Sequence, residues 1–300
     1  MSAKGTKTMS AKQYDILGVT TDSLTMRQAV ELISARAKQN GACYVTKPYV
    51  EFYDAASGDP KIRAVLNQSY LCLPDGVSTQ WAAQYLYGGK RWWGRALWLA
   101  ASIMLRPAAI RKLIPERFSG ATFTWKLLQN CDQQKLSVYL IGSPKNGSIA
   151  TTTAAILQQL PGLKIVGTRP GELGGLRGHA LLQALESDQA VLNELTTELK
   201  QKQPDVILVG LGFPLQELVI SRLANELQRG VLIGEGGTFD YDSFGGIRKR
   251  APKWWRKIGL EWLWRLLLEP SRLERQRAIP RFMWRVYQQG RRLNQAKRNA

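Results

Sequence analysis

The carboxylates that could act as a general base lie where apolar, strand-like runs end. Asp75 stands between a proline and a glycine after the run YLCL, and Glu235 and Asp240 follow the run VLIG. His179 is the only histidine, which disfavours histidine-based catalysis and a histidine-rich metal site. General base catalysis therefore falls to a carboxylate, and an aspartate of ordinary pKa suffices when the transfer itself makes the proton acidic. The alternative role for Asp75 is to cap the helix that follows it.

A second group of residues could contact a phosphate, a sugar or a metal ion. Asp240 and Asp242 have the spacing of a divalent-cation site, although their glycine-rich surroundings favour a turn. Gly212 and Gly237 follow strand-like runs and would let a phosphate approach backbone N–H groups, but a tight turn or helix packing explains them equally well. Gln216 opens the helix after GLGFP, where it could hydrogen-bond a sugar or a nucleotide. A helix-opening residue with no further role is the competing interpretation.

The elements that must position these residues alternate along the chain. Predicted strands span 42–46, 70–73, 136–142, 163–168, 205–212 and 231–237. Predicted helices span 25–38, 48–56, 60–68, 76–87, 121–132, 147–160, 179–201 and 214–228. Strands without polar alternation, separated by helices, indicate a parallel sheet covered on both faces, so the fold class is Rossmann-like α/β.

The carboxyl ends of such strands form the ligand crevice. The loops at 46–48, 74–76, 142–144, 210–217 and 234–242 all follow predicted strands. We therefore expect Asp75 and the polar residues of the second group to gather at one edge of the sheet.

The net charge of +19 comes from two segments. Residues 90–117 hold seven basic residues and one acidic residue, and residues 248–300 hold sixteen and three. Eight of the ten tryptophans lie in the same two segments, which is typical of an anionic membrane surface. A solvated basic tail is the plainer alternative, and RNA binding fits less well because aromatic platforms for bases normally lie on sheets.

No apolar run reaches the roughly 18 residues that span a bilayer. The longest, at 96–105, predicts an interfacial, re-entrant or buried helix. The first residues are polar and show no secretory signal. Cys43, Cys72 and Cys131 are widely spaced within apolar runs, which indicates reduced core residues of a cytosolic protein.

These patterns divide the chain into three parts. Residues 1–12 are expected to be disordered, and residues 13–247 form the Rossmann-like core with a basic, tryptophan-rich insertion at about 89–115. From residue 248 to 300 the apolar residues recur at intervals near three and four between basic ones. This predicts an amphipathic, membrane-associating C-terminal appendage.

Several motifs, taken together, resemble the WecG/TagA/CpsF family of bacterial glycosyltransferases. They are LPDG, ERFSG, GLGFPLQE, GEGGTFDYD and RAPKWWRKIGLEWLWRLLLEPSR, and the resemblance runs from about residue 13 to 277. It implies an inverting transfer of an N-acetylmannosamine-type sugar from a UDP donor to a lipid-diphosphate-linked acceptor in cell-surface polysaccharide assembly. It also implies no metal and no cofactor, and a place on the inner face of the cytoplasmic membrane. The sequence gives no count of subunits, so a homo-oligomer stays open.

The resemblance also implies roles for individual residues. Asp75 is the base, with Thr46 as a polar active-site residue beside it. Gln216 lies in the sugar pocket and Asp240 near the nucleotide, and Arg117 matches the family's arginine ahead of its glycine. The appendage arginines expected near the diphosphates are Arg250, Arg265 and Arg272.

The chain departs from the family pattern at three places. Family members commonly read Thr-x-Asn after the first strand, whereas this chain has Thr46-Lys47-Pro48. Thr122 replaces an aspartate, and the segment at about 89–115 is longer than usual. These differences bear on the donor sugar more than on the class of reaction. Two other hypotheses remain at this point: a non-catalytic basic module that binds nucleotide or RNA, and a metal-dependent transferase that uses Asp240 and Asp242.

Overall fold

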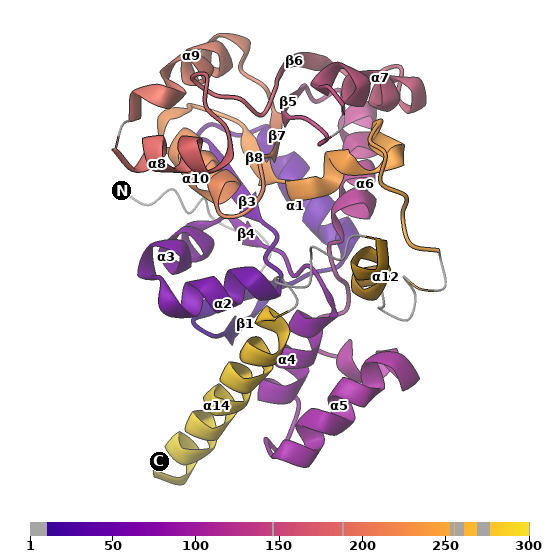
Figure 1. Ribbon diagram of the computed structural model, residues 1–300, viewed down its shortest axis with the longest axis vertical. Helices are drawn as coiled ribbons and strands as arrows, with labels where there is room; N and C mark the ends of the chain where they lie inside the picture. Colours follow the sequence, from indigo (N-terminus) through magenta and orange to yellow (C-terminus); the bar gives the residue numbers. More distant parts are fainter. Residues whose placement is uncertain are drawn as a thin grey trace.

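A sheet of six parallel strands forms the centre of the computed structural model, which describes residues 11–145, 147–187, 189–252, 255, 261–268 and 277–299 (Figure 1). In spatial order the strands are β4 (Leu71–Cys72), β3 (Cys43–Thr46), β8 (Val231–Gly234), β7 (Val206–Gly210), β5 (Val138–Gly142) and β6 (Ile165–Arg169). All six predicted strands are present, and the predicted Rossmann-like α/β class is confirmed.

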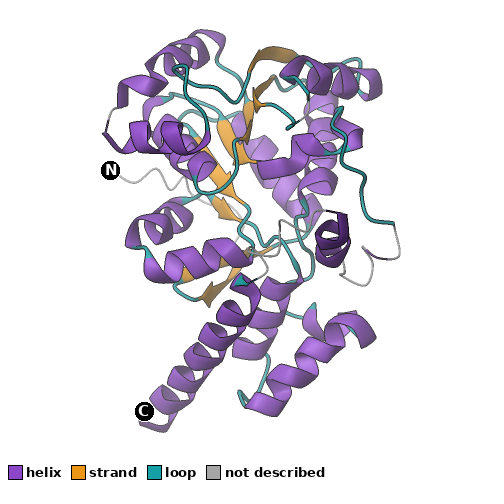
Figure 2. Cartoon of the chain, viewed as in Figure 1, coloured by secondary structure: helices purple, strands orange, loops and turns teal. Residues whose placement is uncertain are grey.

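Helices cover both faces of this sheet because successive strand residues point in opposite directions. Leu208 and Ile233 pack among α1 (Met26–Ala37), α6 (Gly120–Gln133) and α7 (Ile149–Gln159). Ile207 and Leu232 pack among α8 (Gly178–Ser187), α9 (Asn193–Lys202) and α10 (Leu215–Glu226). Figure 2 shows the strands enclosed between these two groups of helices.

A further hydrophobic cluster lies beside the β4 edge of the sheet. Its elements are the hairpin β1 (Lys12–Ile16) and β2 (Val19–Ser23), with α2 (Val50–Gly58), α3 (Pro60–Gln68), α4 (Val77–Tyr87), α5 (Trp93–Leu105), the short η1 (Pro107–Ile110) and α14 (Ala278–Asn299). Phe282 and Val286 of α14 are fully buried, and Asp54 of α2 pairs with Arg281 and Arg285, each at 3.0 Å. In Figure 1, α5 and α14 project beside α4 at the end of the molecule farthest from α7 and α9.

Two elements differ from the sequence prediction. The predicted helix 179–201 divides into α8, η2 (Gln189–Leu192) and α9. Near the end of α8 the Ser187 hydroxyl donates to the carbonyls of Gln183 and Ala184, a local bond that competes with helix continuation. The β1–β2 hairpin was not predicted, because Leu17 and Gly18, both with positive φ, form its turn without the usual Asn-Gly signal.

Other predictions concern single features. The three cysteines are buried and free, as expected of core residues. Within the described residues, no helix combines the length and apolar character needed to cross a bilayer. The C-terminal segment contributes α12 (Glu261–Leu268), and residues 1–10 lie outside the described part.

Candidate active site

Asp75 lies at the carboxyl edge of the sheet, in the loop between β4 and α4. Its backbone N–H donates to the carbonyl of Pro48 at 3.0 Å, and the N–H of Phe118 donates to the carbonyl of Pro74 at 2.8 Å. Gly76, with a φ of +107° that suits glycine, takes the N-cap position of α4. The loop is thus held from two sides, and Asp75 is half-buried one residue ahead of the cap position.

A buried ion pair lies next to this loop. Lys47 directly follows β3, and Glu235 directly follows β8. The Lys47 ammonium is 2.6 Å from the Glu235 carboxylate. The side chains are 5% and 0% exposed, so both charges are removed from water. The Thr124 hydroxyl of α6 donates to the same oxygen of Glu235 at 2.6 Å, and Lys47 also lies over the Phe123 ring. Within the described residues, the second oxygen of Glu235 is buried without a hydrogen-bond partner.

Gln216 joins the loops after β7 and β8. Its side-chain carbonyl accepts from the N–H groups of Gly212 at 3.2 Å and Gly236 at 2.8 Å. Its amide donates to Glu217 at 2.8 Å. Burial raises the pKa of the Glu217 carboxyl to about 8, although the Gln216 hydrogen bond and the Lys47 charge lower it by smaller amounts. A Cβ on Gly234 would lie 2.8 Å from the Gln216 amide nitrogen, so the last residue of β8 must be small for this packing. Gln216 therefore holds the crevice loops together.

Asp240 joins the loop after β5 to the segment that leads into the C-terminal region. It closes the short helix η3 (Gly236–Asp240), accepts from the N–H of Lys145 at 2.8 Å and pairs with Arg248 at 3.0 Å. Asp242, which opens η4 (Asp242–Phe244), accepts from the N–H of Ser243. The described residues contain no group of three or more His, Cys, Asp or Glu side chains arranged to hold a metal ion.

Arg250 reaches the first turn of α6. Its guanidinium donates to the Thr122 hydroxyl at 2.8 Å and lies over the Tyr241 ring. Arg117, half-buried, directly precedes Phe118 and so lies beside the Asp75 loop. These two arginines bring positive charge to this edge of the sheet from two segments far apart in the sequence.

The remaining residues that were predicted for the site lie at different places in the fold. Thr46 is fully buried at the end of β3, where its hydroxyl donates to Ser69 at 3.3 Å. Gly212 and Gly237 lie in the loops after β7 and β8, and a Cβ on Gly237 would approach Asp240 and Arg248 at 3.0 and 3.1 Å. Arg265 belongs to α12, but its side chain and all of Arg272 lie outside the described residues. The structure therefore places Thr46, Asp75, Arg117, Gln216, Asp240 and Arg250 along one edge of the sheet.

Sequence reasoning did not identify Lys47, Thr124 or Glu217 as parts of this site. Lys47 was noted only as a departure from the family pattern, and Glu235 only as a candidate base. The sequence feature that could have indicated this ion pair is a lysine directly after one apolar strand and a glutamate directly after another. The Glu235 carboxylate is committed to Lys47 and Thr124, which makes Glu235 a weak candidate base.

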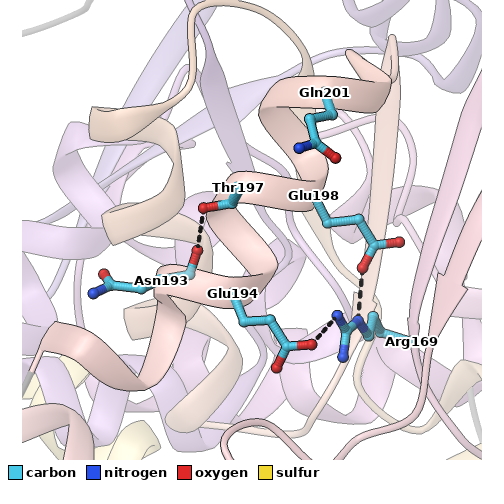
Figure 3. Close-up of a pocket in the computed structure, with 6 residues that line it drawn as sticks. All are labelled: Arg169, Asn193, Glu194, Thr197, Glu198 and Gln201. Carbon is cyan, nitrogen blue, oxygen red and sulfur yellow. Dashed lines mark hydrogen bonds and ion pairs between the residues drawn. The ribbon is translucent and has the colours of Figure 1, made fainter.

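A hollow of about 480 Å³ lies elsewhere, where α9 packs beside β6 (Figure 3). Arg169 at its centre bonds Glu194 at 2.6 Å and Glu198 at 2.7 Å. Burial alone would raise the pKa of Glu198, but hydrogen bonds from Arg169, Tyr139 and Lys202 outweigh it and lower the pKa to about 2. These charges neutralise one another, so the hollow has no reactive group.

Comparisons with known proteins test the family resemblance. A family model described as glycosyl transferase WecG/TagA/CpsF matches residues 14–105 and 93–296. A Bacillus spizizenii protein named N-acetylglucosaminyldiphosphoundecaprenol N-acetyl-beta-D-mannosaminyltransferase is 27% identical over 248 residues, which cover 83% of this chain and 80% of that protein. A Staphylococcus aureus protein of the same name is 27% identical over 288 residues, with 95% and 96% covered. The resemblance stated from the motifs is confirmed.

Proposed function

The chain belongs to the WecG/TagA/CpsF family of glycosyl transferases, and on that premise we propose that it moves an N-acetylmannosamine-type sugar from a UDP donor to a sugar on undecaprenyl diphosphate. The names of the two relatives support the sugar and the lipid-linked acceptor. The product would enter the assembly of a cell-surface polysaccharide.

The observation that carries the proposal is the position of Asp75. Its loop is bonded on one side to Pro48 and on the other, through Pro74, to Phe118, so the carboxylate is held at the carboxyl edge of the sheet where ligands of this fold class bind. This position makes Asp75 the candidate general base.

In the proposed reaction the acceptor hydroxyl attacks the anomeric carbon of the donor sugar from the face opposite UDP. Asp75 accepts the hydroxyl proton as the new bond forms. The bond from the anomeric carbon to the UDP oxygen breaks, and its electron pair leaves with UDP, so the configuration is inverted. Arg117 and Arg250 lie on segments bordering the crevice and would stabilise the charge that develops on the diphosphate.

Residues 248–300 are proposed to hold the enzyme on the inner face of the cytoplasmic membrane. Their sixteen basic and three acidic residues suit anionic lipid, which also surrounds the lipid-linked acceptor. The basic segment would then serve both location and leaving-group chemistry.

A transfer assay tests the proposal directly. The protein is incubated with a panel of UDP sugars and short-chain lipid-diphosphate acceptors, and UDP release is followed. Asp75→Asn is expected to lower the rate at least about 100-fold, because general base catalysis contributes factors of this size, while UDP-sugar binding and the melting temperature stay unchanged. Asp242→Asn makes the same carboxylate-to-amide change at an exposed position, so it is the matched control and should keep full activity.

Full activity of Asp75→Asn would remove Asp75 as the base. If EDTA and Asp242→Asn both abolish transfer, the metal-dependent alternative is correct. If no UDP sugar is consumed and the protein binds RNA with strong salt dependence, the non-catalytic module is correct.

A further inference from the structure

Helix α5 carries a group of large apolar side chains that are each more than half exposed. Of the ten large hydrophobic side chains that are exposed in the described residues, six lie between positions 92 and 105. We name them the outer face of α5: Trp92, Trp93, Leu97, Trp98, Met104 and Leu105. Soluble monomers rarely gather exposed apolar side chains in this way, so the concentration marks an interaction surface.

Helical spacing separates the outer face from the side of α5 that contacts the protein. Trp93, Leu97 and Leu105 recur at four- or eight-residue intervals and are 64%, 59% and 79% exposed. On the other side Leu99 is buried, and the Trp81 indole of α4 donates to the carbonyl of Ala96 at 3.1 Å. The helix is therefore fixed to α4 with the outer face directed away from it.

Two arginines near the start of α5 point back into the protein. Arg95 donates to the carbonyls of Gln84 and Tyr85, both at the end of α4, at 2.8 and 2.9 Å. Arg91 donates to the carbonyl of Leu86 at 2.8 Å. These bonds place positive charge at the negative end of the α4 dipole and leave the outer face without a charged group of its own.

The charges that flank α5 are positive. Lys90, Arg106 and Lys112 are exposed on the segments before and after the helix. The only acidic residue between positions 90 and 117 is Glu116, whose carboxylate accepts from the backbone N–H of Met26 at the start of α1. An apolar strip with exposed cations at both ends complements an anionic lipid surface.

We propose that the outer face of α5 inserts into the interfacial layer of an anionic bilayer and is a membrane contact separate from residues 248–300. The thirteen residues of α5 give a length of about 20 Å, shorter than the ~30 Å hydrocarbon layer, so the helix lies in the membrane plane. Its tryptophans sit at the depth of the headgroups, and the flanking cations meet lipid phosphates. This inference rests on the membrane location proposed above and not on the identity of the sugar.

The arrangement connects the bilayer to the catalytic loop through α4. Asp75 precedes α4 and α5 follows it, and the eleven residues of α4 are about 16 Å long. The chain then returns from α5 to the same loop, where the N–H of Phe118 bonds the carbonyl of Pro74. The α4 helix thus acts as a fixed spacer between the inserted face and the carboxylate.

Vesicle flotation of the full-length chain tests this inference. The probes are vesicles of phosphatidylcholine alone and of phosphatidylcholine with phosphatidylglycerol. The variant Leu97→Glu/Trp98→Glu places two charges on the outer face and should lower the partition coefficient for the anionic vesicles at least about 10-fold. The control Asn193→Asp/Gln201→Glu adds the same charge at exposed positions of α9 and should float like the wild type.

Circular dichroism and the melting temperature establish that both variants fold, independently of any transfer assay. Wild-type flotation by Leu97→Glu/Trp98→Glu would overturn the inference, as would an equal loss in the α9 control. Sedimentation without lipid gives the other decisive outcome: a wild-type dimer that Leu97→Glu/Trp98→Glu dissociates would assign the outer face to a second copy of the chain. Failure of UDP release alone would leave the flotation result intact and would count only against the proposed reaction.

Discussion

The crevice and the α9 hollow both gather charged side chains, but they do so in opposite ways. At the crevice, Lys47 and Glu235 form an ion pair that is almost wholly removed from water. At the hollow, Arg169 is 29% exposed and one of its partners, Glu194, is 74% exposed. The hollow is an open concavity, yet its charges only neutralise one another.

This difference shows that concavity and charge do not by themselves define a site. A buried ion pair is costly to remove from water, so it persists only where further contacts support it. Here those contacts are the Thr124 hydroxyl and the Phe123 ring, and together they connect the loops after β3 and β8 next to the Asp75 loop. Mutation of the Lys47–Glu235 pair should therefore lower the free energy of unfolding far more than mutation of the ion pairs in the hollow.

The largest expected effect is at Lys47. Lys47→Met removes the cation and leaves Glu235 buried without its partner, which should lower the free energy of unfolding by about 3–5 kcal/mol. Urea denaturation at pH 7 measures this loss. The double variant Lys47→Met/Glu235→Gln removes both charges and should recover most of it; a single variant as stable as the wild type would show that the pair contributes nothing.

An intermediate effect is expected at Glu217. The folded protein holds this carboxyl protonated up to a pKa of about 8, whereas the unfolded chain releases the proton near 4.5. The contribution of Glu217 to the free energy of unfolding should therefore be largest below pH 4.5. It should be lost as the pH rises towards 8.

Glu217→Gln keeps an oxygen for the Gln216 amide and cannot ionise. It should raise the free energy of unfolding at pH 7 by about 3 kcal/mol and remove this pH dependence. Denaturation at a series of pH values between 4.5 and 8 provides the measurement. Parallel curves for wild type and variant would mean that Glu217 is ionised in the folded protein.

The smallest effect is expected at the hollow. Arg169→Gln breaks partly exposed ion pairs, so the free energy of unfolding should fall by only about 1 kcal/mol, and less at high salt. Transfer activity should not change, because Arg169 lies on β6, outside the crevice. A loss as large as that of Lys47→Met would remove the distinction between the two clusters.

Much of the sheet was predictable from the sequence, and much of the crevice was not. Apolar runs such as VYLIG predict buried strands, and the strand-end rule then places Asp75 at the ligand edge. Lys47 and Glu235 are 188 residues apart, and their contact depends on β3 and β8 being neighbours. No local pattern indicates that pairing, and the crossovers that set the strand order are not visible in residue spacing.

The C-terminal helix shows the same limit. The sequence shows that α14 is basic, but not that Asp54 of α2 pairs with two of its arginines. The contact of Arg91 with Asn294 likewise joins positions 203 residues apart. Packing of this kind depends on the tertiary fold and becomes visible only with the structure.

The docking of α14 on the first hairpin constrains the order in which the protein can be made. Gln289 accepts from the N–H of Leu17 and donates to Asp15, while Phe282 and Val286 complete the cluster beside α2 and α4. The residues of α14 leave the ribosome after those of the hairpin and α2, so the apolar faces of the hairpin and α2 cannot be covered until α14 has been synthesised. Nascent chains stalled before residue 278 should accordingly stay sensitive to protease at α2.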